Sequence, residues 1–246
     1  MDPRQRFTAA VTDYDRHRPT YPDALIAWLL ERSPGRRAVE LGSGTGILSR
    51  QLAAAGFAVL GIEPNAAMRA AADRQGGGPV YQAGEAEATG LNAGCADLVI
   101  GAQAFHWFDL ERTLPEIDRV GVPGALAVAV WNLRVSEGFG LAYDEAIRAF
   151  SGSYGEVAKP GPTLARLREM RPEGFAAKFS HAQMLDLDGV LGRAWSSSYV
   201  VHGVTDRERF DEALRGAFSE HAIDGRVALR YETVLWGWRV PDSNIR

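Results

Sequence analysis

The chain contains one cysteine, Cys95, among 246 residues. A single cysteine cannot form an internal disulfide, and it cannot supply a cysteine metal cluster. Disulfides are typical of oxidising compartments and are rare in the cytosol. The sequence therefore favours a reducing environment, and we expect a cytoplasmic protein.

Long apolar runs and an excess of basic charge are also missing. No apolar stretch approaches the roughly 18 residues needed to cross a bilayer, and residues 1–6 lack the apolar core of a signal peptide. With 27 Lys and Arg against 31 Asp and Glu, the formal charge is −4, which indicates no basic surface for nucleic acid. We expect neither a membrane nor a nucleic acid as partner.

Apolar runs and helical patterns alternate along most of the chain, which has the length of one α/β domain. Helices are predicted over 21–31, 46–55, 65–74, 110–120 and 206–221. Strands are predicted over 37–41, 58–62, 79–82, 97–102, 125–131, 175–184 and 227–238. This alternation is typical of a parallel sheet with helices on both faces.

A glycine-rich turn follows the first predicted strand. The strand ends near Glu40, the turn reads Gly42-Ser43-Gly44-Thr45-Gly46, and a helix begins at Ile47. Glycine lets the backbone come close to a ligand, and the helix N-terminus offers free N–H groups. The turn therefore favours a small polar cofactor. A tight turn without a ligand is the alternative, and the dinucleotide pattern Gly-x-Gly-x-x-Gly fails at Ile47.

The second predicted strand ends in Glu63-Pro64-Asn65. An acidic residue about 20 positions after the glycines is placed to accept hydrogen bonds from ribose hydroxyls. Glu63 thus indicates an adenosine-containing cofactor without choosing between cofactor families. Alternatively, its charge favours the start of the next helix through the helix dipole.

The acid-x-Gly-x-Gly-x-Gly pattern resembles the first motif of the class I methyltransferases that use S-adenosylmethionine. The resemblance is to the small-molecule subgroup, of the methyltransferase type 11 and trans-aconitate methyltransferase kind. It extends to other segments: the Tyr14…Arg18-Pro19-Thr20-Tyr21-Pro22 stretch, Phe105-His106-Trp107-Phe108-Asp109, residues 181–199, and Arg230-Tyr231-Glu232-Thr233. It covers nearly the whole chain and is weakest over 133–175.

The resemblance implies a Rossmann-like α/β fold. Its seven-stranded sheet is mostly parallel with an antiparallel C-terminal strand, helices cover both faces, and a small helical lid is added. A single domain over 1–246 is expected, made of an N-terminal helical cap (1–32), a cofactor-binding core (36–132), a lid insertion (133–175), and C-terminal strands and a helix (176–246).

The resemblance also implies a set of cofactor contacts. Glu85 would meet the adenine amino group, and the Ala86 N–H a ring nitrogen. Tyr14 and Arg18 would reach the cofactor carboxylate or the substrate, while the turn after the fourth strand would lie at the reactive end of the cofactor. The full set comprises Tyr14, Arg18, Glu40, Gly42, Ser43, Gly44, Thr45, Gly46, Glu63, Pro64, Glu85, Ala86, Gln103 and Ala104.

The reaction implied is an in-line transfer of the methyl group to a small-molecule acceptor. Such an enzyme mainly aligns the two partners and excludes water. His106 is the candidate general base, because its ordinary pKa is near neutrality; a histidine that packs in the turn is the alternative. No metal site is predicted. A cofactor-binding protein without catalysis and a nicotinamide-dependent oxidoreductase are the other functions considered.

Overall fold

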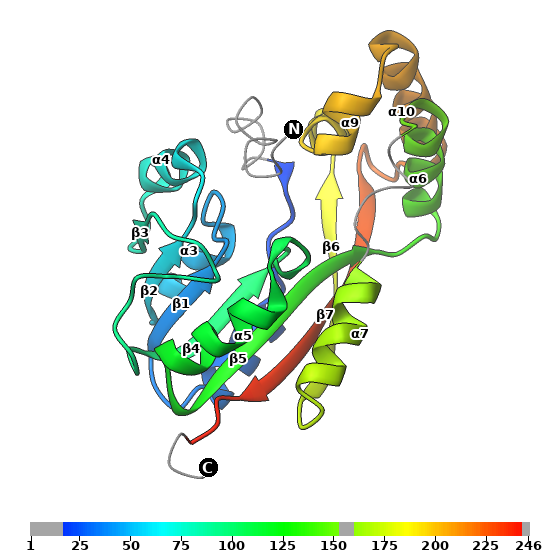
Figure 1. Ribbon diagram of the computed structural model, residues 1–246. Coiled ribbons are helices and arrows are strands. Elements are labelled where there is room, and N and C mark those ends of the chain that lie inside the picture. The colour runs from blue at the N-terminus through cyan, green and yellow to red at the C-terminus, as the bar shows by residue number, and fades with distance from the viewer. Residues whose placement is uncertain (1–16, 153–159, 243–246) are drawn as a thin grey trace.

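The seven apolar runs form the strands of one sheet. The structure is a computed structural model that describes residues 17–152 and 160–242. The strands are β1 (Arg37–Leu41), β2 (Ala58–Ile62), β3 (Val80–Gln82), β4 (Ala96–Ala102), β5 (Gly121–Arg134), β6 (Phe175–Leu185) and β7 (Val227–Arg239). Their order across the sheet is β3-β2-β1-β4-β5-β7-β6 (Figure 1).

Most neighbouring strands are parallel. β1 lies between β2 and β4 and is parallel to both, and the β2–β3 and β4–β5 pairs are parallel as well. β7 runs antiparallel to β5 on one side and to β6 on the other. The predicted sheet, mostly parallel with an antiparallel C-terminal strand, is confirmed.

Helices cover both faces of this sheet. On one face, α2 (Asp23–Arg32) and α3 (Ile47–Ala54) bury leucines such as Leu29 and Leu52 against apolar residues of the central strands. On the other face, α5 (Leu110–Val120) and α7 (Pro160–Met170) lie in front of the sheet (Figure 1). α4 (Ala66–Gln75) packs beside β3.

A separate group of helices stands beyond the upper ends of β5 and β6 (Figure 1). It contains α6 (Phe139–Phe150), α8 (Leu187–Trp195), α9 (Ser198–Gly203) and α10 (Arg207–His221). These helices share one apolar cluster with the adjoining ends of β6 and β7, centred on fully buried side chains such as Tyr143, Val190 and Phe210. We call this group the helical cap; it is a different segment from the N-terminal helical cap expected over residues 1–32.

The sequence did not predict α8 and α9. α8 has nine residues and α9 only six, and isolated helices this short are marginal in water. α9 also carries the β-branched pair Val200-Val201, which favours strands. Packing of Val190, Ala194 and Val200 into the cap stabilises both helices, and such long-range contacts leave no local pattern.

The described parts of residues 133–175 lie in two places. α6 belongs to the helical cap, whereas α7 lies on the sheet and buries Leu167 in the core that also contains Trp131 and Trp236. A lid role for this segment stays a prediction. Within the described residues, the helices are too short or too polar to traverse a bilayer.

Leu126 in the centre of β5 is fully buried. The Leu126→Ala variant is expected to lower the free energy of unfolding by about 2–5 kcal/mol, because it removes apolar contacts and leaves a cavity. Urea unfolding followed by circular dichroism measures this loss. Leu141→Ala on α6 is the matched control: Leu141 is 41% exposed, and its truncation should change stability by about 0.5 kcal/mol or less. Equal losses in the two variants would contradict the placement of β5.

Candidate functional site

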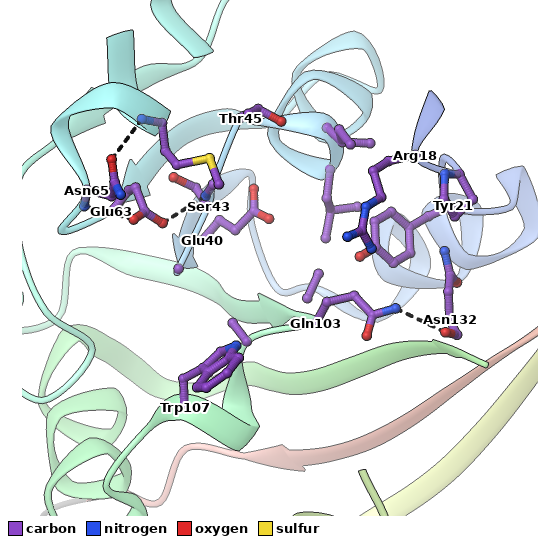
Figure 2. A pocket seen from close by; sticks show the side chains of 18 of the residues that line it. Arg18, Tyr21, Glu40, Ser43, Thr45, Glu63, Asn65, Gln103, Trp107 and Asn132 are labelled. Carbon is purple, nitrogen blue, oxygen red and sulfur yellow. Dashed lines mark hydrogen bonds between the residues drawn. The ribbon is translucent and has the colours of Figure 1, made fainter. Parts of the chain in front are cut away.

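A cavity of about 380 Å³ opens beyond the carboxyl ends of the central strands. This is where ligands bind in open parallel sheets, and the volume falls within the roughly 300–1,000 Å³ of small-molecule sites. Figure 2 shows Glu40, Glu63 and Asn65 on one side of the cavity, with Arg18 and Tyr21 across from them. Its walls thus come from distant parts of the chain.

The glycine turn after β1 forms the floor of this cavity. Gly44 has φ of +56°, and a Cβ at this position would meet no atom within 4 Å, because it would project into open space. At Gly42, in contrast, a Cβ would come 2.8 Å from the Cβ of Ala104. Gly42 therefore permits close packing with the turn after β4, and Gly44 leaves room for a ligand. Gly46 faces the Tyr81 hydroxyl and does not line the cavity.

Glu63, directly after β2, is held by backbone donors. Its Oε2 accepts a hydrogen bond from the Gly44 N–H at 2.9 Å, and its Oε1 accepts one from the Asn65 N–H at 2.9 Å. The side chain of Asn65 in turn caps α4 by accepting from the N–H of Ala67 at 2.9 Å. Glu63 is only 8% exposed, and burial raises the pKa of its carboxyl group. The carboxylate is thereby fixed at the cavity wall.

Glu40 on β1 places a second carboxyl group at the same end of the cavity. It accepts a hydrogen bond from the Ser49 hydroxyl of α3 and is 2% exposed. Burial raises the pKa of Glu40 to about 8, although the Ser49 hydrogen bonds oppose this shift. A cation bound beside Glu40 would favour its ionised form.

The turn after β4 is joined to three other segments through Asn132. Gln103, which adopts φ of +56°, donates from Nε2 to the Asn132 carbonyl oxygen at 3.0 Å. Asn132 donates from Nδ2 to the Thr20 carbonyl oxygen at 3.2 Å, and its Oδ1 accepts from the Thr233 hydroxyl at 2.6 Å. Asn132 therefore connects β5 and β7 with the segment before α2.

His106 does not line the cavity. It belongs to the 3-10 helix η2 (Phe105–Trp107), and its imidazole packs beside the Trp107 ring at a centroid distance of 4.8 Å. Burial lowers the pKa of His106 to about 4. The same short helix instead places Trp107, 44% exposed, on the cavity wall.

Ten of the fourteen residues predicted to contact the cofactor line the cavity. These are Arg18, Glu40, Gly42, Ser43, Gly44, Thr45, Glu63, Pro64, Gln103 and Ala104. Of the others, Tyr14 lies outside the described residues. Gly46, Glu85 and Ala86 are not on the wall. Ala86 is buried in a sheet-face cluster, and Glu85 forms a backbone bridge with Ala88.

Several lining residues lie outside the predicted set of cofactor contacts, although the sequence also suggests Trp107 or Phe108 as a partner of the sulfonium. They are Tyr21, Ile47, Leu48, Asn65, Met68, Trp107, Phe108, Asn132, Arg193 and Tyr231, with Pro19 and Ala102. Asn65 and Met68 follow Glu63 closely and could have been found by extending that motif into α4. Arg193 and Tyr231 come from the helical cap and β7, and only the fold brings them to the cavity.

Comparison of the sequence with known proteins shows the family to which this chain belongs. Residues 39–129 match the family described as a methyltransferase domain. A methyltransferase of uncharacterised activity from Mycobacterium tuberculosis is 39% identical over 240 residues, which cover 93% of each chain. The chain belongs to the methyltransferase family. A similarly named methyltransferase of Schizosaccharomyces pombe is 30% identical over 132 residues, or 52% of this methyltransferase and 53% of the yeast protein.

Solved structures extend the likeness to the fold. A protein named as a type II methyltransferase from Anaeromyxobacter dehalogenans has a TM-score of 0.72 and 26% identity, covering 91% of this chain and 98% of its own. A phosphoethanolamine N-methyltransferase of Haemonchus contortus, in complex with phosphomonomethylethanolamine and S-adenosylhomocysteine, has a TM-score of 0.56 and 15% identity. It aligns over 97% of this chain and 58% of its own, and at that identity it supports the fold alone.

The pKa of Glu40 predicts a pH dependence of stability. Because the folded-state pKa is about 8 and the ordinary value is 4.5, the folded protein retains a proton that the unfolded chain releases. The free energy of unfolding therefore falls as pH rises from about 4.5 to about 8. Glu40→Gln, which keeps an acceptor for Ser49, is expected to remove this contribution.

Urea unfolding of the ligand-free protein at several pH values tests this prediction. The stability of Glu40→Gln relative to wild type should rise steadily from about pH 5 to about pH 8. Groups that both proteins share, His106 among them, cancel in this difference. A difference that does not change with pH would show that Glu40 is ionised in the folded protein.

Proposed function

We propose that the cavity binds S-adenosylmethionine and that this methyltransferase transfers the methyl group to a small-molecule acceptor held beside it. The observation that carries the proposal is the open space at Gly44 between two buried carboxyl groups, Glu40 and Glu63. A zwitterionic nucleoside needs close backbone approach, an acceptor for its ribose hydroxyls and a partner for its ammonium group. The glycine turn and the two acids provide these three features.

Each carboxyl group has a separate proposed role. Glu63 would accept hydrogen bonds from the ribose hydroxyls through oxygens that now accept from the Gly44 and Asn65 N–H groups. Glu40 would face the ammonium group, whose charge favours the carboxylate form. The bound cofactor supplies a methyl group on a positively charged sulfur. The protein then has to position the acceptor and exclude water.

The aromatic wall of the cavity suits a cationic reaction centre. Trp107, at the end of the short helix η2 after β4, lines the cavity with Tyr21 on the opposite side (Figure 2). A cation over an aromatic face gains about 0.5–2 kcal/mol, and indole is the best of the aromatic rings in this role. We infer that Trp107 packs near the sulfonium and shields it from solvent.

A small molecule is the acceptor that this cavity fits. A volume of about 380 Å³ is that of a small-molecule site. The net charge of −4 gives no support to nucleic acid as an acceptor. A cytoplasmic setting stays an expectation based on the single cysteine.

Calorimetric titration with S-adenosylmethionine tests the cofactor. Binding in the micromolar range is expected, and Glu63→Ala should weaken it about 10- to 100-fold, the effect of losing hydrogen bonds to a charged group. Glu220→Ala, an exposed acid on α10 outside the cavity wall, is the control and should bind normally. Saturable binding of NAD in place of S-adenosylmethionine would contradict the proposal.

His106 provides a test of the mechanism. Because His106 lies off the cavity and burial lowers its pKa to about 4, it is poorly placed to accept a proton from the acceptor. We expect His106→Asn to retain turnover, measured as S-adenosylhomocysteine release with an acceptor found in a small-molecule screen. A loss of about 100-fold or more, with cofactor affinity unchanged, would instead assign His106 as the general base.

A further inference from the structure

A buried guanidinium group lines the cavity without an acidic partner. Arg193 on α8 is 4% exposed. It donates from Nε to the Tyr231 hydroxyl at 3.1 Å, and from Nη1 to the hydroxyls of Ser197 at 2.9 Å and Ser196 at 3.3 Å. Within residues 17–152 and 160–242 it forms no ion pair, and its Nη2 donates no hydrogen bond.

Such a group is unfavourable unless something compensates its charge. Arginine remains protonated under all ordinary conditions. A buried charge is destabilising when it is not paired, and neutral hydroxyls compensate it only in part. The guanidinium fork matches the geometry of a carboxylate or phosphate. Arg193 is therefore suited to an anion that enters the cavity with a ligand.

Neighbouring charges increase this preference. Arg134 pairs with Asp144, with 2.8 Å between Nη2 and Oδ1, so that carboxylate is already occupied. Arg18, also on the wall, donates from Nη2 to the Ser196 carbonyl oxygen at 2.9 Å and so lies beside the hydroxyls that hold Arg193. Arg193 thus lies beside Arg18, at the end of the cavity opposite Glu40 and Glu63.

We propose that Arg193 binds an anionic group of the methyl acceptor and that this group is an anchor, separate from the atom that is methylated. The proposal rests on the proposed function. Negative charge on an attacking oxygen is consumed as the new bond forms, so an ion pair there would stabilise the ground state more than the transition state. An ion pair with a different group of the acceptor persists in the transition state and does not favour the ground state in this way.

The position of Arg193 fits an anchor. Its partner Tyr231 lies on β7, two strands away from β4, which is about 10 Å across the sheet. Gln103 and Ala104, at the end of β4, lie where the methyl group is proposed to be. The acceptor would therefore carry a carboxylate or phosphate at one end and a nucleophilic oxygen, nitrogen or sulfur several bonds away.

The methyl transfer itself requires no electron pair or proton from Arg193. The electron pair of the nucleophile forms a bond to the methyl carbon, and the carbon–sulfur bond breaks with its electron pair passing to the sulfur. S-adenosylhomocysteine leaves, and any proton on the nucleophile passes to water. Arg193 is thus a positioning residue.

The test observes Arg193 directly, by ¹H–¹⁵N spectroscopy of arginine-labelled protein saturated with S-adenosylhomocysteine. Its Nε–H signal is assigned by its loss in Arg193→Lys. Benzoate and inorganic phosphate are the anionic probes, and benzamide is the neutral counterpart of benzoate. We expect a saturable shift with at least one anion and none with benzamide, and the stronger anion distinguishes a carboxylate from a phosphate site.

Matched variants follow anion binding by calorimetry. Arg193→Gln should weaken it about tenfold or more, and Arg193→Lys, which keeps the charge, should weaken it less. Arg215→Gln, an exposed arginine of α10 in the same helical cap, should not change it. No shift with either anion, or an equal shift with benzamide, would overturn the proposal.

Two further results separate the anchor from other roles. If Arg193→Gln weakens S-adenosylhomocysteine binding as much as Glu63→Ala does, Arg193 binds the cofactor and the proposal fails. If incubation with benzoate and S-adenosylmethionine yields methyl benzoate, the bound anion is itself methylated and the anchor role fails; absence of the ester supports it. If the proposed function is wrong, the wild-type protein itself will not bind S-adenosylmethionine or S-adenosylhomocysteine.

Discussion

The hydrogen bond from the Gly44 N–H to the Glu63 carboxylate is the contact on which the cavity depends. It joins the turn after β1 to the loop after β2, and its N···O distance is 2.9 Å. Because neighbouring parallel strands end at the same edge of the sheet, these two loops meet without any long connection. The Asn65 N–H fixes the other oxygen of Glu63, and Asn65 begins α4. The Glu63 carboxylate thus holds the glycine turn, the loop after β2 and the start of α4 together.

Local patterns predicted the parts of the site that lie at strand ends. Glu40, Gly44 and Glu63 are each within a few residues of a strand, so hydrophobic runs were enough to locate them. The direction of His106 could not be predicted in this way, because a 3-10 helix turns it away from the cavity and presents Trp107 instead. Arg193 and Asn132 reach the site through the order of the strands and the packing of the helical cap, which no local sequence pattern encodes.

The charges of the cavity are separated along its length. Glu40 of β1 and Glu63 after β2 occupy one end, and Arg18 lies across from them (Figure 2). Arg193 of α8 lies beside Arg18, because both donate to Ser196. Separation of this kind orients a ligand with charges of both signs before any close contact forms. Tyr199 responds to the same field: burial opposes its ionisation, yet the charges of Arg134, Arg193 and Arg18, together with a hydrogen bond to Ser197, lower the pKa of Tyr199 to about 8.

The position of β7 governs when this protein can first fold. β7 is the last strand of the residues that the structure describes, but it lies between β5 and β6 and provides Tyr231 and Thr233 beside the cavity. During synthesis β6 therefore has no neighbouring strand, and the Tyr231 hydroxyl that accepts from Arg193 and the Thr233 hydroxyl that donates to Asn132 are missing, until β7 has been made. Contacts of such long sequence separation form slowly. The glycine turn and the acids beside it are made early, so the end of the cavity that holds Glu40 and Glu63 can form before the end that holds Arg193 and Tyr231.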